Sequence, residues 1–153
     1  MRRTTLSVLS ALLLAASAAL AATVTIVNTD GAGEGFNDPT VVSPVGGNPG
    51  TTLGEQRLYC FQAAADQWGS LLYSPVEIRI EASFDPLECY PDSGVLGAST
   101  TPYAIRNFPN APVSNTWYHP ALANSLAGYD LSAAQADIIT YYNSAIDDDP
   151  NCL

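Results

Sequence analysis

The sequence has no lysine, and this scarcity of positive charge excludes two classes of partner. Apart from Arg2 and Arg3, its only cations are Arg57, Arg79 and Arg106, against 15 carboxylates. The formal charge of −10 for the whole sequence becomes −12 when Arg2 and Arg3 are set aside. Such a chain repels phosphates, so nucleic acids and anionic membrane surfaces are excluded as partners.

Histidine is almost absent as well, which bears on catalysis. His119 is the single histidine, whereas a hydrolytic zinc site needs two or three imidazoles or a set of thiolates. The sequence contains no H-E-x-x-H, C-x-x-C or G-x-S-x-G motif. Cys60 and His119 are formally a thiol–imidazole pair, but a cysteine within a helix is more typical of packing. We therefore predict no catalytic, cofactor-binding or metal-ligating residue.

Only one long apolar run is present, and it lies at the start of the chain. Arg2 and Arg3 precede the uncharged stretch Leu6–Leu20, which ends in Ala19-Leu20-Ala21. This pattern is typical of a secretory signal peptide over residues 1–21, cleaved after Ala21. The run is too short for a typical membrane span. We expect a secreted protein, extracellular or periplasmic, whose residues 22–153 form a single domain.

Three cysteines in an exported chain leave one thiol unpaired. Cys60 lies within a helical pattern, on the edge of its apolar stripe. Cys89 and Cys152 both lie in loop-like surroundings rich in proline and aspartate, which favours a bridge between them. Pairing of Cys60 with either one remains an alternative.

The stretch 51–84 organises the predicted fold. Thr52 and Glu55 have the spacing of a capping box at the start of a helix. An apolar stripe then recurs at steps of three and four, formed by Leu58, Phe61, Ala65, Trp68 and Leu72. Residues 76–84 alternate between apolar and polar, as a half-buried strand does. With a first strand at 23–28, this predicts two parallel strands joined by a helix, hence an α+β fold with a small mixed sheet backed by one long helix.

The remaining segments are expected to be short and rich in loops. Residues 30–50 are predicted to form a loop. Its Asp30, Glu34, Asn37 and Asp38 are expected to lie in flexible acidic turns, and the alternative is that their oxygens bind calcium. Short strands are predicted at 103–108 and 116–118, and a helix at 121–127 ended by Gly128. Residues 137–144 favour a strand, with a helix starting at 132–135 as the alternative. An acidic turn follows at 147–150.

Several stretches together resemble a bacterial family of secreted zincin-like metallopeptidases, many of which also carry a protease-associated domain. The resemblance covers nearly all of the chain after residue 21. It is carried by Asn28–Thr40, Pro44–Leu58, Phe84–Cys89, Phe108–Val113, Asn115–Tyr118, Ala121–Asn124 and Asn151–Leu153.

The resemblance implies the non-catalytic N-terminal part of the peptidase domain, with its early strands and long backing helix. In that family the zinc-binding H-E-x-x-H helix follows soon after the position that matches Cys152. No metal ligand or catalytic glutamate can therefore be assigned to this sequence. The resemblance also implies the Cys89–Cys152 bridge and leaves Cys60 unpaired.

Two functions follow as expectations. The first is a secreted, catalytically incomplete N-terminal portion of a zincin-like metallopeptidase, without activity of its own. The chain alone is then expected to bind no cofactor. Zinc would bind only if a C-terminal peptidase segment with the zinc motif were supplied, and that segment would be a partner of this chain. The alternative is a stand-alone extracellular binding module that keeps the fold without the chemistry.

Overall fold

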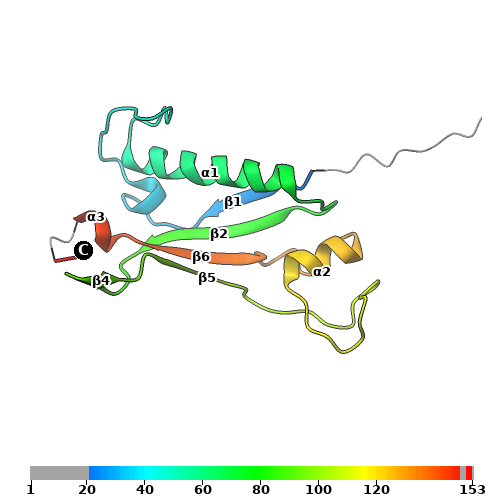
Figure 1. Cartoon of the computed structure of the whole chain (residues 1–153). Helices are drawn as coiled ribbons and strands as arrows, with labels where there is room; N and C mark the ends of the chain where they lie inside the picture. The colour runs from blue at the N-terminus through cyan, green and yellow to red at the C-terminus, as the bar shows by residue number, and fades with distance from the viewer. Residues whose placement is uncertain (1–20, 149–150, 153) are drawn as a thin grey trace, which may run out of the picture.

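The computed structural model describes residues 21–148 and 151–152. The expected signal peptide, apart from Ala21, lies outside the described residues, as do residues 149 and 150 of the predicted acidic turn. The long helix α1 (Leu53–Leu71) lies alongside one side of a sheet, and the short helix α2 (Pro120–Ala127) lies beyond one end of it (Figure 1).

The main sheet has four strands in the order β1-β2-β6-β5. Strands β1 (Val24–Asn28), β2 (Ile78–Asp85) and β6 (Ile138–Asn143) are parallel, and β5 (Gly97–Thr100) pairs with β6 in the antiparallel direction. The small hairpin of β3 (Cys89–Tyr90) and β4 (Ser93–Gly94) stands apart from it. This mixed sheet with one long helix confirms the predicted α+β class.

The strand register gathers the apolar residues on one face of the sheet. Val24 lies beside Ile78, and Ile80 lies between Ile26 and Ile138. Because side chains alternate between the two faces of a strand, these residues share the face that α1 packs on. The opposite face carries Arg79, Glu81 and other polar side chains of β2. The alternation predicted for residues 76–84 therefore positions α1.

The first turn of α1 is fixed by the predicted capping box. The Thr52 hydroxyl accepts a hydrogen bond from Glu55 N–H at 3.2 Å, and the Glu55 carboxylate accepts one from Thr52 N–H at 3.2 Å. The same carboxylate also accepts bonds from the N–H and hydroxyl of Thr51, both at 2.8 Å. These bonds hold the pKa of Glu55 below its ordinary value, chiefly through Thr51.

We expect Thr52→Ala to lower the free energy of unfolding by about 1 kcal/mol, because it leaves an N–H group of the first turn without its acceptor. Urea denaturation followed by circular dichroism measures the change. Ser70→Ala is the matched control, since this exposed hydroxyl donates only to the Gln67 carbonyl oxygen of its own helix. Equal unfolding midpoints for the two variants would contradict the predicted role of the cap.

The loop before α1 contains a short 3-10 helix, η1 (Gly35–Asn37), which was not predicted from the sequence. The Asp30 carboxylate accepts bonds from Phe36 N–H at 2.6 Å and from Phe84 N–H at 2.8 Å. Glu34 likewise accepts a bond from Gly31 N–H at 2.8 Å. Asp30 therefore ties the loop to β2, and Glu34 closes a turn within the loop.

Phe36 of η1 is buried in an aromatic cluster between the loop, the long helix and the sheet. Its ring centroid lies 4.7 Å from that of Phe61 and 5.2 Å from that of Phe84, both edge to face. Tyr142 of β6 lies 4.7 Å from Phe61. The cluster thus joins η1, α1, β2 and β6 near the carboxyl ends of the parallel strands.

Two of the later elements differ from the prediction. The strand predicted at 103–108 is wrong: Ile105 forms only an isolated bridge with Tyr118. Asn107 adopts a left-handed φ of 57° and accepts a hydrogen bond from Asn115 N–H at 2.8 Å, which makes this segment a turn. The residues predicted at 116–118 likewise contribute only the Tyr118 bridge.

The antiparallel strand β5 was missed, because its sequence, Gly-Ala-Ser-Thr, has little strand propensity and depends on pairing with β6. The strand predicted at 137–144 is confirmed as β6, and its helical alternative is wrong. The helix predicted at 121–127 is confirmed as α2, which ends at Gly128 with a left-handed φ of 81°.

Candidate functional site: an open apolar groove

The apolar stripe of α1 is only partly covered by the sheet. Ala65 is buried at 4 % exposure, but Trp68 is 60 % and Leu72 is 42 % exposed. Cys60 and Leu71, which extend the apolar surface on the same side as Trp68, are exposed too. The helix therefore presents a wider apolar surface than β1 and β2 cover.

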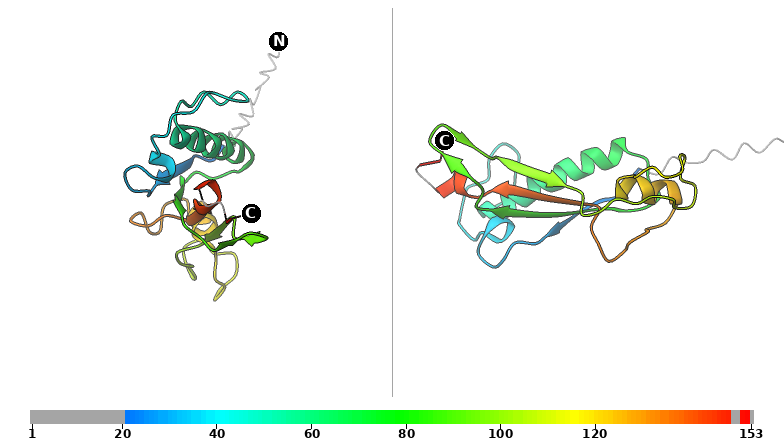
Figure 2. Two further views of the ribbon diagram at one scale, coloured as in Figure 1. Left: turned by 90° about the vertical axis from the view of Figure 1, so that its left-hand side faces the viewer. Right: turned by 90° about the horizontal axis from the view of Figure 1, so that it is seen from below.

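An open groove of about 660 Å³ runs along this uncovered surface. One wall is α1, the floor is the apolar face of the sheet, and α2 closes one end. In Figure 1, α1 follows β1, while β6 and β5 lie farther from the helix; Figure 2 shows the same arrangement from two further sides. The lining residues are Val24, Ile26, Cys60, Phe61, Ala64, Ala65, Trp68, Leu72, Ile78, Ile80, Ser99, His119, Ala121, Leu122, Ile138, Thr140 and Tyr142.

The described residues that line the groove are mostly apolar. No lysine, arginine, aspartate or glutamate lines it. Of its hydroxyls, Ser99 donates to Thr140 at 2.8 Å, and Thr140 donates to the Ala98 carbonyl oxygen at 3.3 Å. Since these two hydroxyls donate within the protein and the rest of the lining is mostly apolar, the groove offers chiefly apolar contact.

The two residues considered for a thiol–imidazole pair both line this groove. Cys60 lies on the α1 wall, exposed, with its sulfur 3.6 Å from Asn48 Nδ2. His119 is the exposed N-cap residue of α2. Among the described residues, no group of three histidine, cysteine, aspartate or glutamate side chains has an arrangement that could hold a metal ion.

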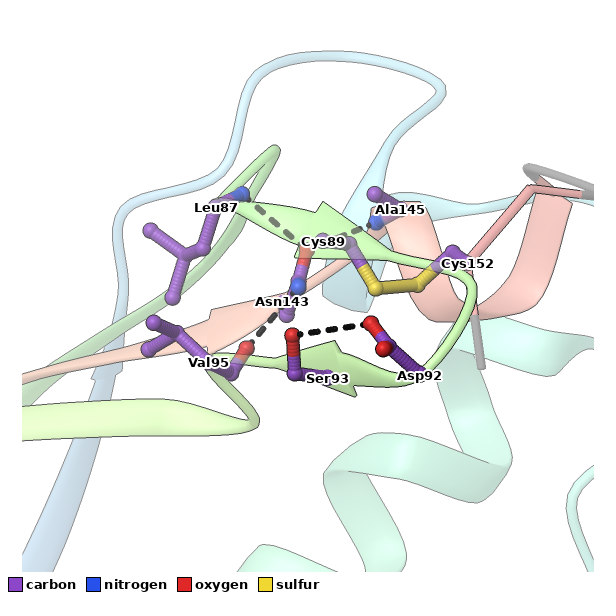
Figure 3. The surroundings of a disulfide bond; sticks show 8 residues. All are labelled: Leu87, Cys89, Asp92, Ser93, Val95, Asn143, Ala145 and Cys152. Carbon is purple, nitrogen blue, oxygen red and sulfur yellow. Dashed lines mark hydrogen bonds between the residues drawn. A yellow bond between two sulfur atoms is a disulfide. The ribbon is translucent and has the colours of Figure 1, made fainter.

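The Cys89–Cys152 disulfide lies near the carboxyl end of β6, with 5.1 Å between the two Cα atoms (Figure 3). Asn143, the last residue of β6, reinforces this region. Its side-chain oxygen accepts bonds from Leu87 N–H and Ala145 N–H at 3.0 and 2.9 Å, and its side-chain nitrogen donates to the Val95 carbonyl oxygen at 2.8 Å. The disulfide and Asn143 thus hold the chain that follows β6 beside the β3–β4 hairpin.

A buried polar cluster anchors α2 at the other end of the groove. The Asp137 side chain accepts bonds from Asn124 Nδ2 and from Arg79 N–H, both at 2.9 Å. Asn124 also accepts a bond from Leu131 N–H at 2.9 Å. Asp137 is 3 % and Asn124 is 1 % exposed. Burial, reinforced by the charge of Asp130, raises the pKa of Asp137 above its ordinary value.

This raised pKa predicts a pH-dependent stability. The unfolded chain releases the Asp137 proton at a lower pH than the folded chain, so stability falls as pH rises from about 4 through the folded pKa. Asp137→Asn removes this slope, although it also loses one accepted hydrogen bond. Thermal melts between pH 4 and 7 measure both effects, with Asp92→Asn on the exposed β3–β4 turn as the control. An unchanged slope in Asp137→Asn would contradict the prediction.

Comparison with protein-family models, with curated proteins and with solved structures finds no match. Within the described part of the chain, none of the helices combines the length and the apolar character needed to cross a bilayer. Together, the fold and the pocket define an α+β domain with an open apolar groove.

The groove itself was not predicted from the sequence. The available signal lay in Cys60, Ala64 and Leu71, which widen the apolar arc of α1 beyond the predicted stripe. A helix with an apolar surface this wide usually packs against more than one neighbour.

Proposed function

We propose that this chain is the secreted, catalytically incomplete N-terminal portion of a zincin-like metallopeptidase, and that its groove receives a helix. The family resemblance of the sequence gives the class. The single observation that carries the proposal is the groove, because within the described part of the chain no layer covers this apolar sheet face beside the backing helix. A surface of this kind is typical of an interaction site.

The dimensions of the groove support a helix as its occupant. Its α1 wall runs from Cys60 to Leu72, which corresponds to about 18 Å at 1.5 Å per helical residue. Three to four turns of a second helix have this length, and helices packed side by side lie about 8–10 Å apart. The incoming helix should therefore turn an uncharged face toward Phe61, Trp68 and Leu122.

In this proposal, the zinc-dependent catalysis of a zincin requires the incoming helix. In the family that the sequence resembles, the helix with the H-E-x-x-H motif supplies zinc ligands and the general base. The described residues hold no cluster that fits zinc, so no catalytic step is assigned to them. Their role in this proposal is to position the incoming helix.

The coding DNA on the 3′ side of the Leu153 codon tests the assignment to this family. We expect an H-E-x-x-H motif there. Sequence without this motif in any frame would contradict the proposal. So would stoichiometric zinc in the purified protein together with proteolysis that a chelator abolishes.

The groove is tested separately with a fluorescent dye that binds apolar surfaces. We expect dye binding by a protein that melts cooperatively, and reduced binding by Leu72→Glu. Leu96→Glu is the control, because Leu96 is 64 % exposed and does not line the groove. Dye binding without a cooperative melt would instead indicate a collapsed state and would exclude the alternative of a stand-alone binding module.

The proposal includes export through the N-terminal signal peptide. The disulfide between Cys89 and Cys152 is compatible with an oxidising compartment. We expect N-terminal sequencing of the exported protein to begin at Ala22. An N-terminus at Met1 would contradict signal cleavage.

A further inference from the structure

The outer edge of β1 is a second unoccupied surface, on the other flank of α1. β1 is the terminal strand of the main sheet. Ile78 N–H donates to the Thr23 carbonyl oxygen at 2.8 Å, so the backbone groups of Thr23 face β2. Because residues of a parallel strand alternate in direction, the N–H and C=O groups of Val24 and Ile26 face away from β2. No described strand pairs with this edge.

A trench of about 470 Å³ runs along this edge. Its floor is formed by residues 21–26, and its α1 wall includes Gln62, Asp66 and Ser70. These three residues are four positions apart and so share one flank of the helix. Cys60, Ala64 and Trp68 form the other flank, which lines the apolar groove. The trench and the groove thus lie on opposite flanks of α1, although Val24, Ile26 and Ala65 between them line both.

Carboxylates lie beside the edge on both faces of the sheet, and the proposed signal cleavage would add one positive group, the α-ammonium of Ala22, at the end of the trench. Asp66 lines the trench on the side of α1. On the opposite face, the Thr25 hydroxyl donates a hydrogen bond to the Glu77 carboxylate. No arginine lines the trench. A second copy of this chain would bring one strongly acidic chain against another, which disfavours self-association at this edge.

We propose that the outer edge of β1 is a strand-addition site for an extended basic peptide. The backbone of Val24 and Ile26 offers two donors and two acceptors in the spacing of a sheet ladder. Cations on the incoming strand would lie near Asp66 if they point to the face that α1 covers, or near Glu77 if they point to the opposite face. The net negative charge of the chain speeds the approach of such a peptide. The site does not depend on the proposed function, although the side chains of Val24 and Ile26 also line the helix groove.

The test uses three fluorescently labelled heptapeptides with blocked ends and the purified protein. One alternates valine and lysine, the second alternates valine and glutamate, and the third is the valine–lysine peptide with its edge-facing amides N-methylated. We expect fluorescence anisotropy to show binding of the first only, weakening as salt is raised. Equal binding of the N-methylated peptide would overturn strand addition, because that peptide keeps the charge and loses the main-chain donors.

Variants locate the site on β1. Asp66→Asn should weaken binding of the valine–lysine peptide about two- to fivefold, whereas Asp92→Asn on the distant β3–β4 turn should leave it unchanged. Ile26→Pro removes an N–H that faces the open edge and should abolish binding. If Ile26→Pro does not fold, the N-methylated peptide decides the question. A dimer of the protein alone that the peptide fails to dissociate would also overturn the proposal.

Discussion

Removal of the disulfide by Cys89→Ser together with Cys152→Ser is expected to lower the free energy of unfolding by about 4 kcal/mol. The two cysteines are 63 residues apart, so the bond removes a large part of the conformational freedom of the unfolded chain. For a domain of this size, such a loss corresponds to a decrease of about 15 °C in the melting temperature. Calorimetry of the oxidised protein and of the double variant measures it.

Cys60→Ser is the matched control for the disulfide. Its thiol is exposed and unpaired in the structure, so we expect its substitution to leave the melting temperature unchanged. The effect of the double variant should be largest near Cys152, where the bond fixes the chain after β6 beside the β3–β4 hairpin. Hydrogen exchange locates that effect. Equal melting temperatures for the double variant and for Cys60→Ser would contradict the proposed contribution of the bond.

The stretch 51–84 was predictable because its structure is encoded locally. The spacing of Thr52 and Glu55 gives the cap, and the alternation of residues 76–84 gives both the strand and its buried face. The parallel pairing of β1 with β2 follows from the single helix that joins them. These elements are strongly periodic, and no distant contact is needed to specify them.

β5 and the groove were not predictable for the opposite reason. β5 has almost no local preference and is a strand because β6 lies beside it. The pattern of α1 shows which residues are apolar, but only the arrangement of α1, α2 and the sheet decides which of them remain exposed. Trp68 illustrates this, since its spacing predicts burial and the structure leaves it 60 % exposed.

The two ends of the groove are fixed by different kinds of contact. At the end near β3 and β4, Cys152 and Asn143 hold the chain that follows β6. At the other end, the buried pair Asn124 and Asp137 links α2 to β6. Since both regions are tied to the sheet, the proposed binding of a helix would require little ordering of the domain.

The aromatic cluster carries the second large expected effect. We expect Phe36→Ala to lower the free energy of unfolding by about 3–4 kcal/mol. Phe36 is 5 % exposed and packs edge to face against Phe61 and Phe84. Removal of its ring leaves a cavity where η1, α1 and β2 meet. The Asp30 carboxylate bonds to the backbone N–H groups of Phe36 and Phe84, so these segments cannot easily move together to fill the cavity. Urea denaturation measures the loss.

Trp68→Ala is the comparison variant, because it removes an aromatic ring from the groove wall and not from the buried aromatic cluster. Both substitutions remove a large aromatic ring, but the ring of Trp68 lines the groove and is mostly exposed. Because its burial in this domain is small, we expect Trp68→Ala to cost less than about 1 kcal/mol of stability and to reduce binding of the apolar dye. Phe36→Ala should reverse this pattern, with a large loss of stability and unchanged dye binding in the molecules that remain folded. If Trp68→Ala destabilised the protein as much as Phe36→Ala does, Trp68 would belong to the core of this domain and the groove would not be open to a partner helix.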